Sequence, residues 1–261
     1  MKLPLYWIDA FTEHTFHGNP AAVVPLAAWP DAALLQQIAF ENGLAETAFF
    51  VRTGPGRFHL RWFTPTVEMD LCGHATLASA FVIFKHLGPA GDLITFDSRS
   101  GPLTVTRRPG NLLELDFPSR PAQVCAPPAA LLAALGAQPQ HVAQARDTLC
   151  VFARAEDVLA LRPDFAALAQ LDSFAIIVTA PGQDCDFVSR FFAPGAGVPE
   201  DPVTGSAHCT LIPYWAQRLG KTRLHARQVS ARGGELWCEL RGDRVGIAGR
   251  AVLYLRGEIE V

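Results

Sequence analysis

Short apolar runs separated by turn residues recur along this chain, and this pattern predicts mainly β-strands. Residues 57–63 show it most clearly, because Phe58, Leu60 and Trp62 alternate with polar residues and share one face of a strand. Asp31 is a suitable N-cap for the helix that we predict after it. Further strands are predicted at 5–11, 21–26, 45–51, 93–96, 103–107, 112–117, 174–179, 186–192 and 251–261, and further helices at 127–135 and 163–171.

Two longer apolar runs predict central helices. Residues 75–87 are apolar almost all round, which is typical of a helix buried on every side. A curved sheet wrapped around that helix would bury it. The second run follows residue 207 and contains Pro213. Because proline costs about 3 kcal/mol inside a helix, we expect a kink or a short first segment at that point.

The two runs belong to similar stretches, 68–87 and 200–219. The landmarks that keep an offset of 132 residues, the difference between 205 and 73, are Gly73-His74-Ala75 with Gly205-Ser206-Ala207, Leu87-Gly88 with Leu219-Gly220, and Ser98 with Ser230. An internal duplication explains them and predicts two similar lobes, each presenting a helix N-terminus to a shared cleft. Chance similarity of two buried helices is the alternative.

These elements together predict an α+β fold of two lobes, each a curved, mostly antiparallel sheet wrapped around a central helix. The segment 118–128 holds four prolines and is interpreted as the link. We therefore assign residues 1–117 to an N-terminal lobe and 118–248 to a C-terminal lobe.

Composition narrows the class of protein. The chain has 261 residues, 49% of them hydrophobic, which is enough for a sizeable core. Its net charge of −3 gives no basic field for nucleic acid. Its apolar runs are shorter than a membrane span, and Pro4 and Asp9 interrupt any signal-peptide core. We expect a cytoplasmic protein that binds neither nucleic acid nor membrane.

Metal and cofactor motifs are not found in the sequence. The six cysteines include no CxxC pair and do not have the spacing of a disulfide framework. His14 with His17, and His208 beside Cys209, lack the spacing of a zinc site. There is no GxGxxG or GxxxxGK. The prediction is a protein with no metal and no cofactor.

The small-residue turns before the two apolar runs are the candidate binding sites. A helix N-terminus offers unpaired N–H donors and the positive end of the dipole, which suit a carboxylate. The expected partner is therefore a small carboxylated molecule. The binding residues proposed in these turns are Gly73, His74, Ala75, Gly205, Ser206 and Ala207, each of which has the alternative of an ordinary helix start.

Glu46, His74 and Asp201 are the candidate catalytic residues. Glu46 stands in an otherwise apolar strand, where a poorly solvated carboxylate is suited to taking up and returning a proton. A surface glutamate at a strand edge is the alternative. His74 would hold substrate or relay a proton, or else cap its own helix. Asp201 would bind a hydroxyl or amine, or else stabilise the helix dipole.

Five sequence blocks resemble the phenazine-biosynthesis-protein-F-like (PhzF-like) isomerase family, which is related to diaminopimelate epimerase. The blocks are DAFTEHTFHGNPAAVV at 9–24, ENGLAETAFF at 41–50, RWFTPTVEMDLCGHATLASA at 61–80, EDPVTGSAH at 200–208 and SARGGEL at 230–236. The resemblance implies the epimerase-like two-lobed fold, with 249–261 returning to the first lobe. It also implies a cofactor-independent isomerase, a homodimer, and Glu46 as the acid/base with His74, Asp201 and Ser206 in the site. In the family's named member the substrate is trans-2,3-dihydro-3-hydroxyanthranilate.

Cys72 separates this chain from the related epimerases, which use two thiols. Cys72 falls where the resemblance places the first thiol, but the matching position in the second copy is Thr204. A hydroxyl is too weak an acid to be the second base, so two-thiol racemisation is disfavoured. The alternatives are an epimerase, racemase or dehydratase of an amino-acid-like acid, or a non-catalytic binding protein on the same scaffold.

Overall fold

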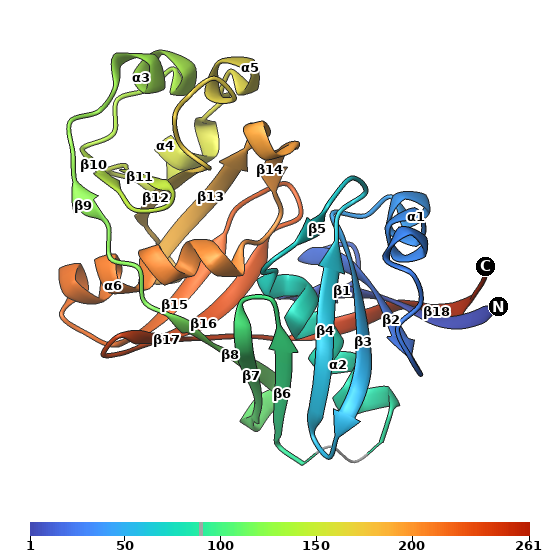
Figure 1. Cartoon of the computed structure of the whole chain (residues 1–261). Coiled ribbons are helices and arrows are strands. Elements are labelled where there is room, and N and C mark those ends of the chain that lie inside the picture. Colours follow the sequence, from blue (N-terminus) through green and yellow to red (C-terminus); the bar gives the residue numbers. More distant parts are fainter. Residues whose placement is uncertain (89–90) are drawn as a thin grey trace. The chain divides into compact units, whose positions relative to one another are not determined.

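A computed structural model describes residues 1–88 and 91–261 of the chain (Figure 1). Contacts between residues divide it into two compact units. Unit 1 consists of Met1–Asp116 and Ala248–Val261, and unit 2 consists of Phe117–Ile247. In the described part of the chain, no helix has the length and apolarity needed to cross a membrane.

Unit 1 is a mixed sheet with two helices. Its strands are β1 Lys2–Ala10, β2 Asn19–Leu26, β3 Glu46–Gly54, β4 Arg57–Phe63, β5 Glu68–Met69, β6 Leu93–Ser98, β7 Gly101–Arg108, β8 Leu112–Pro118, whose end passes into unit 2, and β18 Ala251–Glu260; α1 is Ala32–Asn42, α2 is Gly73–His86, and a 3-10 turn covers Pro109–Asn111. The pairings β2–β3 and β4–β6 are parallel, and the other pairings, β1–β18, β1–β2, β3–β4, β4–β5, β6–β7 and β7–β8, are antiparallel.

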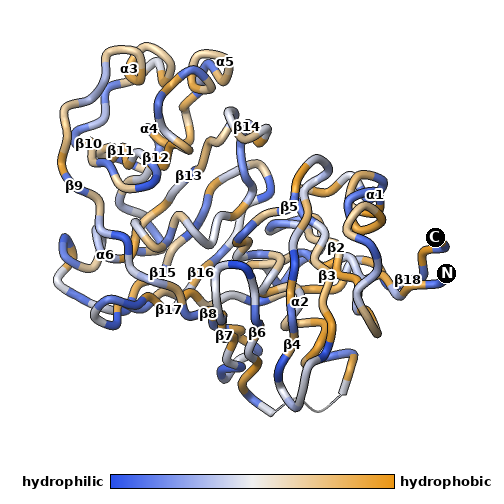
Figure 2. Tube along the Cα trace, viewed as in Figure 1, coloured by the Kyte–Doolittle hydropathy of each residue, from blue (hydrophilic) through white to orange (hydrophobic). Residues whose placement is uncertain are grey.

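The central helix of unit 1 is α2, as the sequence predicted. Residues 73–80 are all buried, and α2 packs against β1, β2, β3 and β18. Figure 2 shows hydrophobic residues concentrated on α2 and β3. Exposing such an apolar helix to water costs free energy, so the helix is stable only when a sheet encloses it.

Unit 2 repeats this plan with more irregular connections. Its elements are β9 Gln123–Val124, α3 Ala129–Leu135, β10 His141–Gln144, β11 Thr148–Val151, α4 Ala155–Ala160, α5 Phe165–Leu168, β12 Ile176–Pro181, β13 Phe187–Ala193, β14 Val198–Asp201, α6 His208–Leu219, β15 Arg223–Gln228, β16 Gly234–Arg241 and β17 Arg244–Gly249, with 3-10 turns at Pro194–Ala196 and Gly205–Ala207. The pairings β11–β12 and β13–β15 are parallel, whereas β9–β10, β10–β11, β12–β13, β13–β14 and β15–β16 are antiparallel.

The two units share one order of pairings, which confirms the predicted duplication. β2, β3, β4, β5, α2, β6 and β7 in unit 1 correspond to β11, β12, β13, β14, α6, β15 and β16 in unit 2. The strand register agrees, because Trp62 pairs with Met69 before α2, and Phe191 pairs with Asp201 before α6. The predicted α+β class with two similar lobes is therefore confirmed.

An arginine–glutamate pair braces the hairpin that leads to each central helix. Arg61 donates to both carboxylate oxygens of Glu68 at 2.7 and 2.8 Å, and this bond holds the pKa of Glu68 below its usual range. Arg190 makes the same two bonds to Glu200 at 2.7 and 2.8 Å. Arg190 also donates at 3.1 Å to two carbonyls of the segment 158–161. Each pair fixes the chain just before the turn that opens the helix.

We expected a kink or a short first segment at Pro213. The helix α6 instead runs unbroken from His208 to Leu219. The carbonyl of Cys209 lies four residues before Pro213 and has no helical N–H to accept from. The backbone N–H of Arg120 donates to it instead, at 2.8 Å. This replacement satisfies the carbonyl that the proline leaves without its usual donor.

We expect Arg190→Gln to destabilise the fold more than Arg61→Gln, by roughly 2–4 against 1–2 kcal/mol. The reason is that Arg190 serves two carbonyls as well as its glutamate. The measurement is the free energy of unfolding in urea. The control is Arg154→Gln, which breaks an exposed ion pair with Asp157 and should leave the stability unchanged. Equal losses for Arg190→Gln and Arg61→Gln would contradict the assignment.

Candidate active site

Glu46 is the first residue of β3, and its side chain is only 14% exposed. Its Oε2 lies 3.2 Å from Nε2 of His74, in a close contact that lacks the alignment of a hydrogen bond. The structure therefore places Glu46 against the start of α2, and not on an exposed strand edge.

His74 is the second residue of α2 and is 4% exposed. Its Nδ1 lies 3.1 Å from Nδ2 of Asn19 and 3.6 Å from Sγ of Cys72. The ring thus contacts β2 and β3 and does not cap its own helix. Burial by itself lowers the pKa of His74, but the neighbouring Cys72 and Glu46 groups outweigh it and raise that pKa well above its usual range.

Asn19 is a site residue that the sequence analysis did not select. It is fully buried at the first position of β2. Gly18 before it has a φ of +65°, and a Cβ there would collide with the carbonyl oxygen of Ala10. Only glycine fits this close approach. The Gly18-Asn19 pair therefore starts β2 in the one position that brings the Asn19 amide to His74.

Cys72 is the N-cap of α2, and its thiol is buried. Burial first, and then the charge of Glu46, raise the pKa of the thiol above its usual range. The donor atoms of Glu46, Cys72 and His74 lie within 4.8 Å of one another and are types that zinc prefers. However, Cys72 faces Nδ1 and Glu46 faces Nε2, and one ion binds only one ring nitrogen. This arrangement suits a proton path better than a three-ligand metal centre.

Asp201, in unit 2, is the last residue of β14. The hydroxyl of Thr204 donates to its Oδ2 at 2.5 Å. Gln228, at the end of β15, donates to the Asp201 carbonyl at 2.7 Å and to the Thr204 hydroxyl at 3.2 Å. Gln228 could not be selected from its sequence context, because it lies 24 positions or more from its partners and outside every motif.

The turn Gly205–Ala207 opens α6 as a 3-10 turn. Ser206 is half-exposed there, and Nη2 of Arg146 lies 3.5 Å from its Oγ. Arg146 is held by the buried Asp147 at 3.0 and 3.2 Å and lies over the ring of Phe174 at 4.5 Å. A fixed cation beside the turn adds to the helix N-terminus as an anion-binding feature. The sequence analysis missed Arg146, which belongs to no recognisable motif.

The proposed residues therefore form one cluster in each unit. In unit 1, Glu46 meets the start of α2, whose first amides, at Gly73, His74 and Ala75, precede the first helical hydrogen bond at Thr76. In unit 2, Asp201 and the turn of Gly205, Ser206 and Ala207 lie within one short segment held by Thr204 and Gln228.

His208 is buried directly behind the turn in unit 2. Its Nδ1 lies 2.9 Å from the carbonyl oxygen of Thr204, so this nitrogen carries the proton and donates. Burial lowers the pKa of His208 to about 4. A neutral, fully buried imidazole bonded to backbone supports the turn and does not bind substrate.

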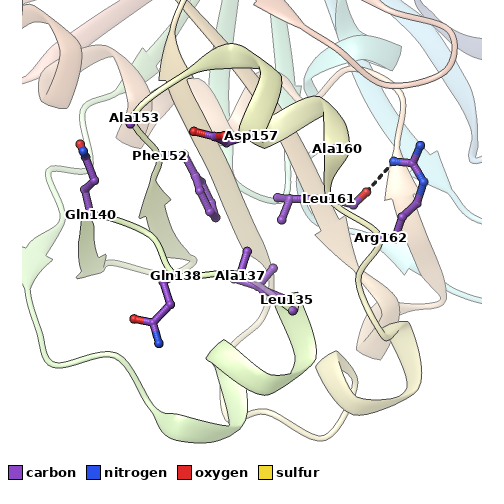
Figure 3. Close-up of a pocket in the computed structure, with 11 residues that line it drawn as sticks. Leu135, Ala137, Gln138, Gln140, Phe152, Ala153, Asp157, Ala160, Leu161 and Arg162 are labelled. Atoms are coloured by element: carbon purple, nitrogen blue, oxygen red, sulfur yellow. Dashed lines mark hydrogen bonds between the residues drawn. The ribbon is translucent and has the colours of Figure 1, made fainter.

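A hollow of about 650 Å³ in unit 2 is lined by other residues (Figure 3). Leu135, Phe152 and Leu161 contribute apolar walls, and Gln140 and Arg162 contribute polar groups. Arg162 donates to the Leu161 carbonyl at 2.8 Å. None of the site residues predicted from the sequence lines this hollow.

Comparisons with known proteins agree over the whole chain. A family model described as "phenazine biosynthesis-like protein" matches residues 8–257. An uncharacterized isomerase of Pseudomonas aeruginosa is 52% identical over 261 residues, with 100% of both chains covered. A crystal structure of a PhzF family phenazine biosynthesis protein from Enterococcus faecalis matches with a TM-score of 0.97 and 48% identity, covering 100% of both chains. A hydroxyproline epimerase from Agrobacterium vitis matches with a TM-score of 0.64 and 9% identity, covering 99% of this chain and 92% of that one, so the likeness is one of fold.

His208 gives the protein a predictable response to acid. Its pKa of about 4 lies below the 6.5 or so of an exposed histidine, so between these pH values only the unfolded chain binds the proton. Stability contributed by His208 is therefore present above pH 6.5 and is lost as the pH falls towards 4, by up to roughly 3 kcal/mol. We expect the unfolding free energy of His208→Gln, measured in urea, to depend less steeply on pH between 6.5 and 4. A slope identical to that of the unsubstituted protein would contradict this.

Proposed function

We propose that this chain, which belongs to the phenazine biosynthesis-like protein family, is an isomerase that relocates a proton on a small carboxylic acid without a bound cofactor. The observation that carries the proposal is the buried contact of 3.2 Å between Glu46 and His74. It supplies a carboxylate in poorly solvated surroundings next to a group that holds a proton, which is the requirement for general acid–base catalysis.

Glu46 acts as the base and then as the acid. Its carboxylate takes a proton from a carbon of the substrate, and the electron pair of that C–H bond moves into the conjugated system. Glu46 then returns the proton to another carbon, so the double bond has shifted and no atom is lost. His74 lies 3.2 Å from Glu46 and orients the substrate or relays the proton.

The carboxylate of the substrate is assigned to the turn that opens α6 in unit 2. The turn Gly205–Ala207 offers N–H donors at the positive end of a helix dipole. Ser206 adds a hydroxyl and Arg146 adds a cation. Asp201 is assigned to a hydroxyl or amino group of the substrate. The protein is expected to act as a homodimer.

The candidate substrate is trans-2,3-dihydro-3-hydroxyanthranilate, which carries a carboxylate, an amine and a hydroxyl. A two-thiol epimerase is the weaker candidate, because the position that corresponds to Cys72 in unit 2 is Thr204, whose hydroxyl is bonded to Asp201. A one-thiol dehydration through Cys72 and a non-catalytic binding role are the other candidates.

We expect Glu46→Gln to lower kcat on trans-2,3-dihydro-3-hydroxyanthranilate by about 100- to 10,000-fold, because the amide cannot accept the proton. The measurement follows substrate loss and deuterium incorporation in D2O, which shows to which carbon the proton returns. The matched control is Glu41→Gln on the exposed face of α1. Full activity of Glu46→Gln would remove Glu46 from the mechanism.

Carboxylate binding can be tested without turnover. Anthranilate should raise the melting temperature, while 2-aminobenzamide, which has the same shape but no charge, should not. At a hundred times its dissociation constant a ligand stabilises the folded state by about 2.7 kcal/mol. We expect Arg146→Gln and Ser206→Ala to reduce the shift. Equal shifts with acid and amide would contradict an anion site.

A further inference from the structure

Gln228 has an orientation that the structure fixes without ambiguity. Its Oε1 accepts a hydrogen bond from the backbone N–H of Thr204 at 2.8 Å. Because a backbone N–H only donates, this oxygen cannot be exchanged with the amide nitrogen. The NH₂ group of Gln228 therefore donates to the Thr204 hydroxyl at 3.2 Å and to the Asp201 carbonyl at 2.7 Å.

The hydroxyl of Thr204 has its proton directed by this arrangement. Since its oxygen accepts from Gln228, the one hydroxyl proton is available for the 2.5 Å bond to Oδ2 of Asp201. A hydroxyl that donates stabilises the ionised form of a carboxyl group, because that form is the stronger acceptor. The direction of donation thus runs from Gln228 through Thr204 to Asp201.

The neighbouring backbone is held as firmly as the side chains. The hydroxyl of Ser230 donates to the carbonyl of Pro202 at 2.8 Å and accepts from the N–H of Gly233 at 3.1 Å. Gln228 and Thr204 are 1% and 7% exposed. Water therefore competes little for these bonds, and the carboxylate has a fixed position.

Unit 1 keeps the same backbone plan but has none of this polar chain. The positions that correspond to Asp201 and Thr204 are Met69 and Cys72, at the same offset of 132 residues. At this offset Gln228 corresponds to Phe96 in β6, which is apolar and fully buried. Ser98 corresponds to Ser230, and its hydroxyl donates to the nearby carbonyl of Gly101. The fold does not require the chain of donors, so its presence in unit 2 points to a role in chemistry.

We propose that Thr204 and Gln228 are positioning residues that hold Asp201 as an ionised hydrogen-bond acceptor, so that the substrate meets it with a hydroxyl or an amino group. This rests on the proposed function of the same site. It narrows the substrate class to carboxylic acids that also carry a hydroxyl or amine donor. It also makes Asp201 the acceptor for a proton on a heteroatom, while Glu46 serves the proton on carbon.

The experiment compares Thr204→Val, which has the same shape without the hydroxyl, with Thr204→Ser, which retains it. Selective ¹³C labelling of aspartate carboxyl groups, with Asp201→Asn for assignment, follows the Asp201 carboxyl in the full-length protein without substrate. In Thr204→Val this carboxyl should titrate at higher pH than in the unsubstituted protein, because a hydrogen bond to its charged form is lost. Thr204→Ser should restore the lower midpoint.

The kinetic readout uses trans-2,3-dihydro-3-hydroxyanthranilate. We expect Thr204→Val to lower kcat/KM about 10- to 100-fold, with the acidic limb of the pH profile moved to higher pH, and Thr204→Ser to recover most of the loss. Gln228→Met should act in the same direction as Thr204→Val. Ser98→Ala, at the end of β6 in unit 1, is the control and should change neither readout.

The outcomes separate this inference from the proposed function. An unchanged Asp201 titration in Thr204→Val overturns the inference, and so does an unchanged pH profile, even while Glu46→Gln remains inactive. Full activity of Glu46→Gln overturns the proposed function, and the ¹³C titration still decides whether Thr204 holds Asp201 ionised. If Gln228→Met fails to fold, because the Thr204 amide loses its acceptor, the Thr204 pair alone decides.

Discussion

A carboxylate and an imidazole kept away from water impose the strictest requirement on unit 1. Removing a charge from water costs several kcal/mol unless a partner and further hydrogen bonds replace the solvent. Oε2 of Glu46 lies 3.2 Å from Nε2 of His74, and the side-chain amide of Asn19 contacts the other ring nitrogen. These residues start β3, α2 and β2, so the packing of three elements must agree before the pair can form. The fully buried α2 provides that agreement, because an apolar helix enclosed by a sheet cannot shift without exposing its surface.

The duplicated architecture presents two different polar clusters on one backbone plan. Both units use a braced hairpin, a tight turn and a central helix. Just before the N-terminus of the central helix, unit 1 has Met69 and Cys72 where unit 2 has Asp201 and Thr204. In unit 1, His74 and Glu46 lie beside Cys72 at this point. The polar pair instead builds a directed chain of donors in unit 2. Divergence of a few side chains on a retained backbone is sufficient for this difference.

Sequence periodicity predicted the elements whose burial is uniform, and it did less well elsewhere. The run 75–87 predicted α2, because no other structure buries such a segment on every side. The strands β10 and β11 were not predicted, since each has only four residues. Asn19, Gln228 and Arg146 were missed as site residues for another reason. Their partners lie 24 to 60 positions away, and only the folded sheet brings them together.

The proline within α6 ties two distant parts of unit 2 into one folding unit. Its missing N–H leaves the Cys209 carbonyl to be satisfied by the backbone of Arg120, nearly 90 residues earlier. A helix that accepts a hydrogen bond from such a remote segment is incomplete until that segment has docked. The residues of α6 alone therefore cannot satisfy all the backbone hydrogen bonds of the helix. Any fragment of unit 2 that starts beyond residue 120 would carry a bare carbonyl in its central helix, so the stretch after β8 is as much a part of the core as of the connection.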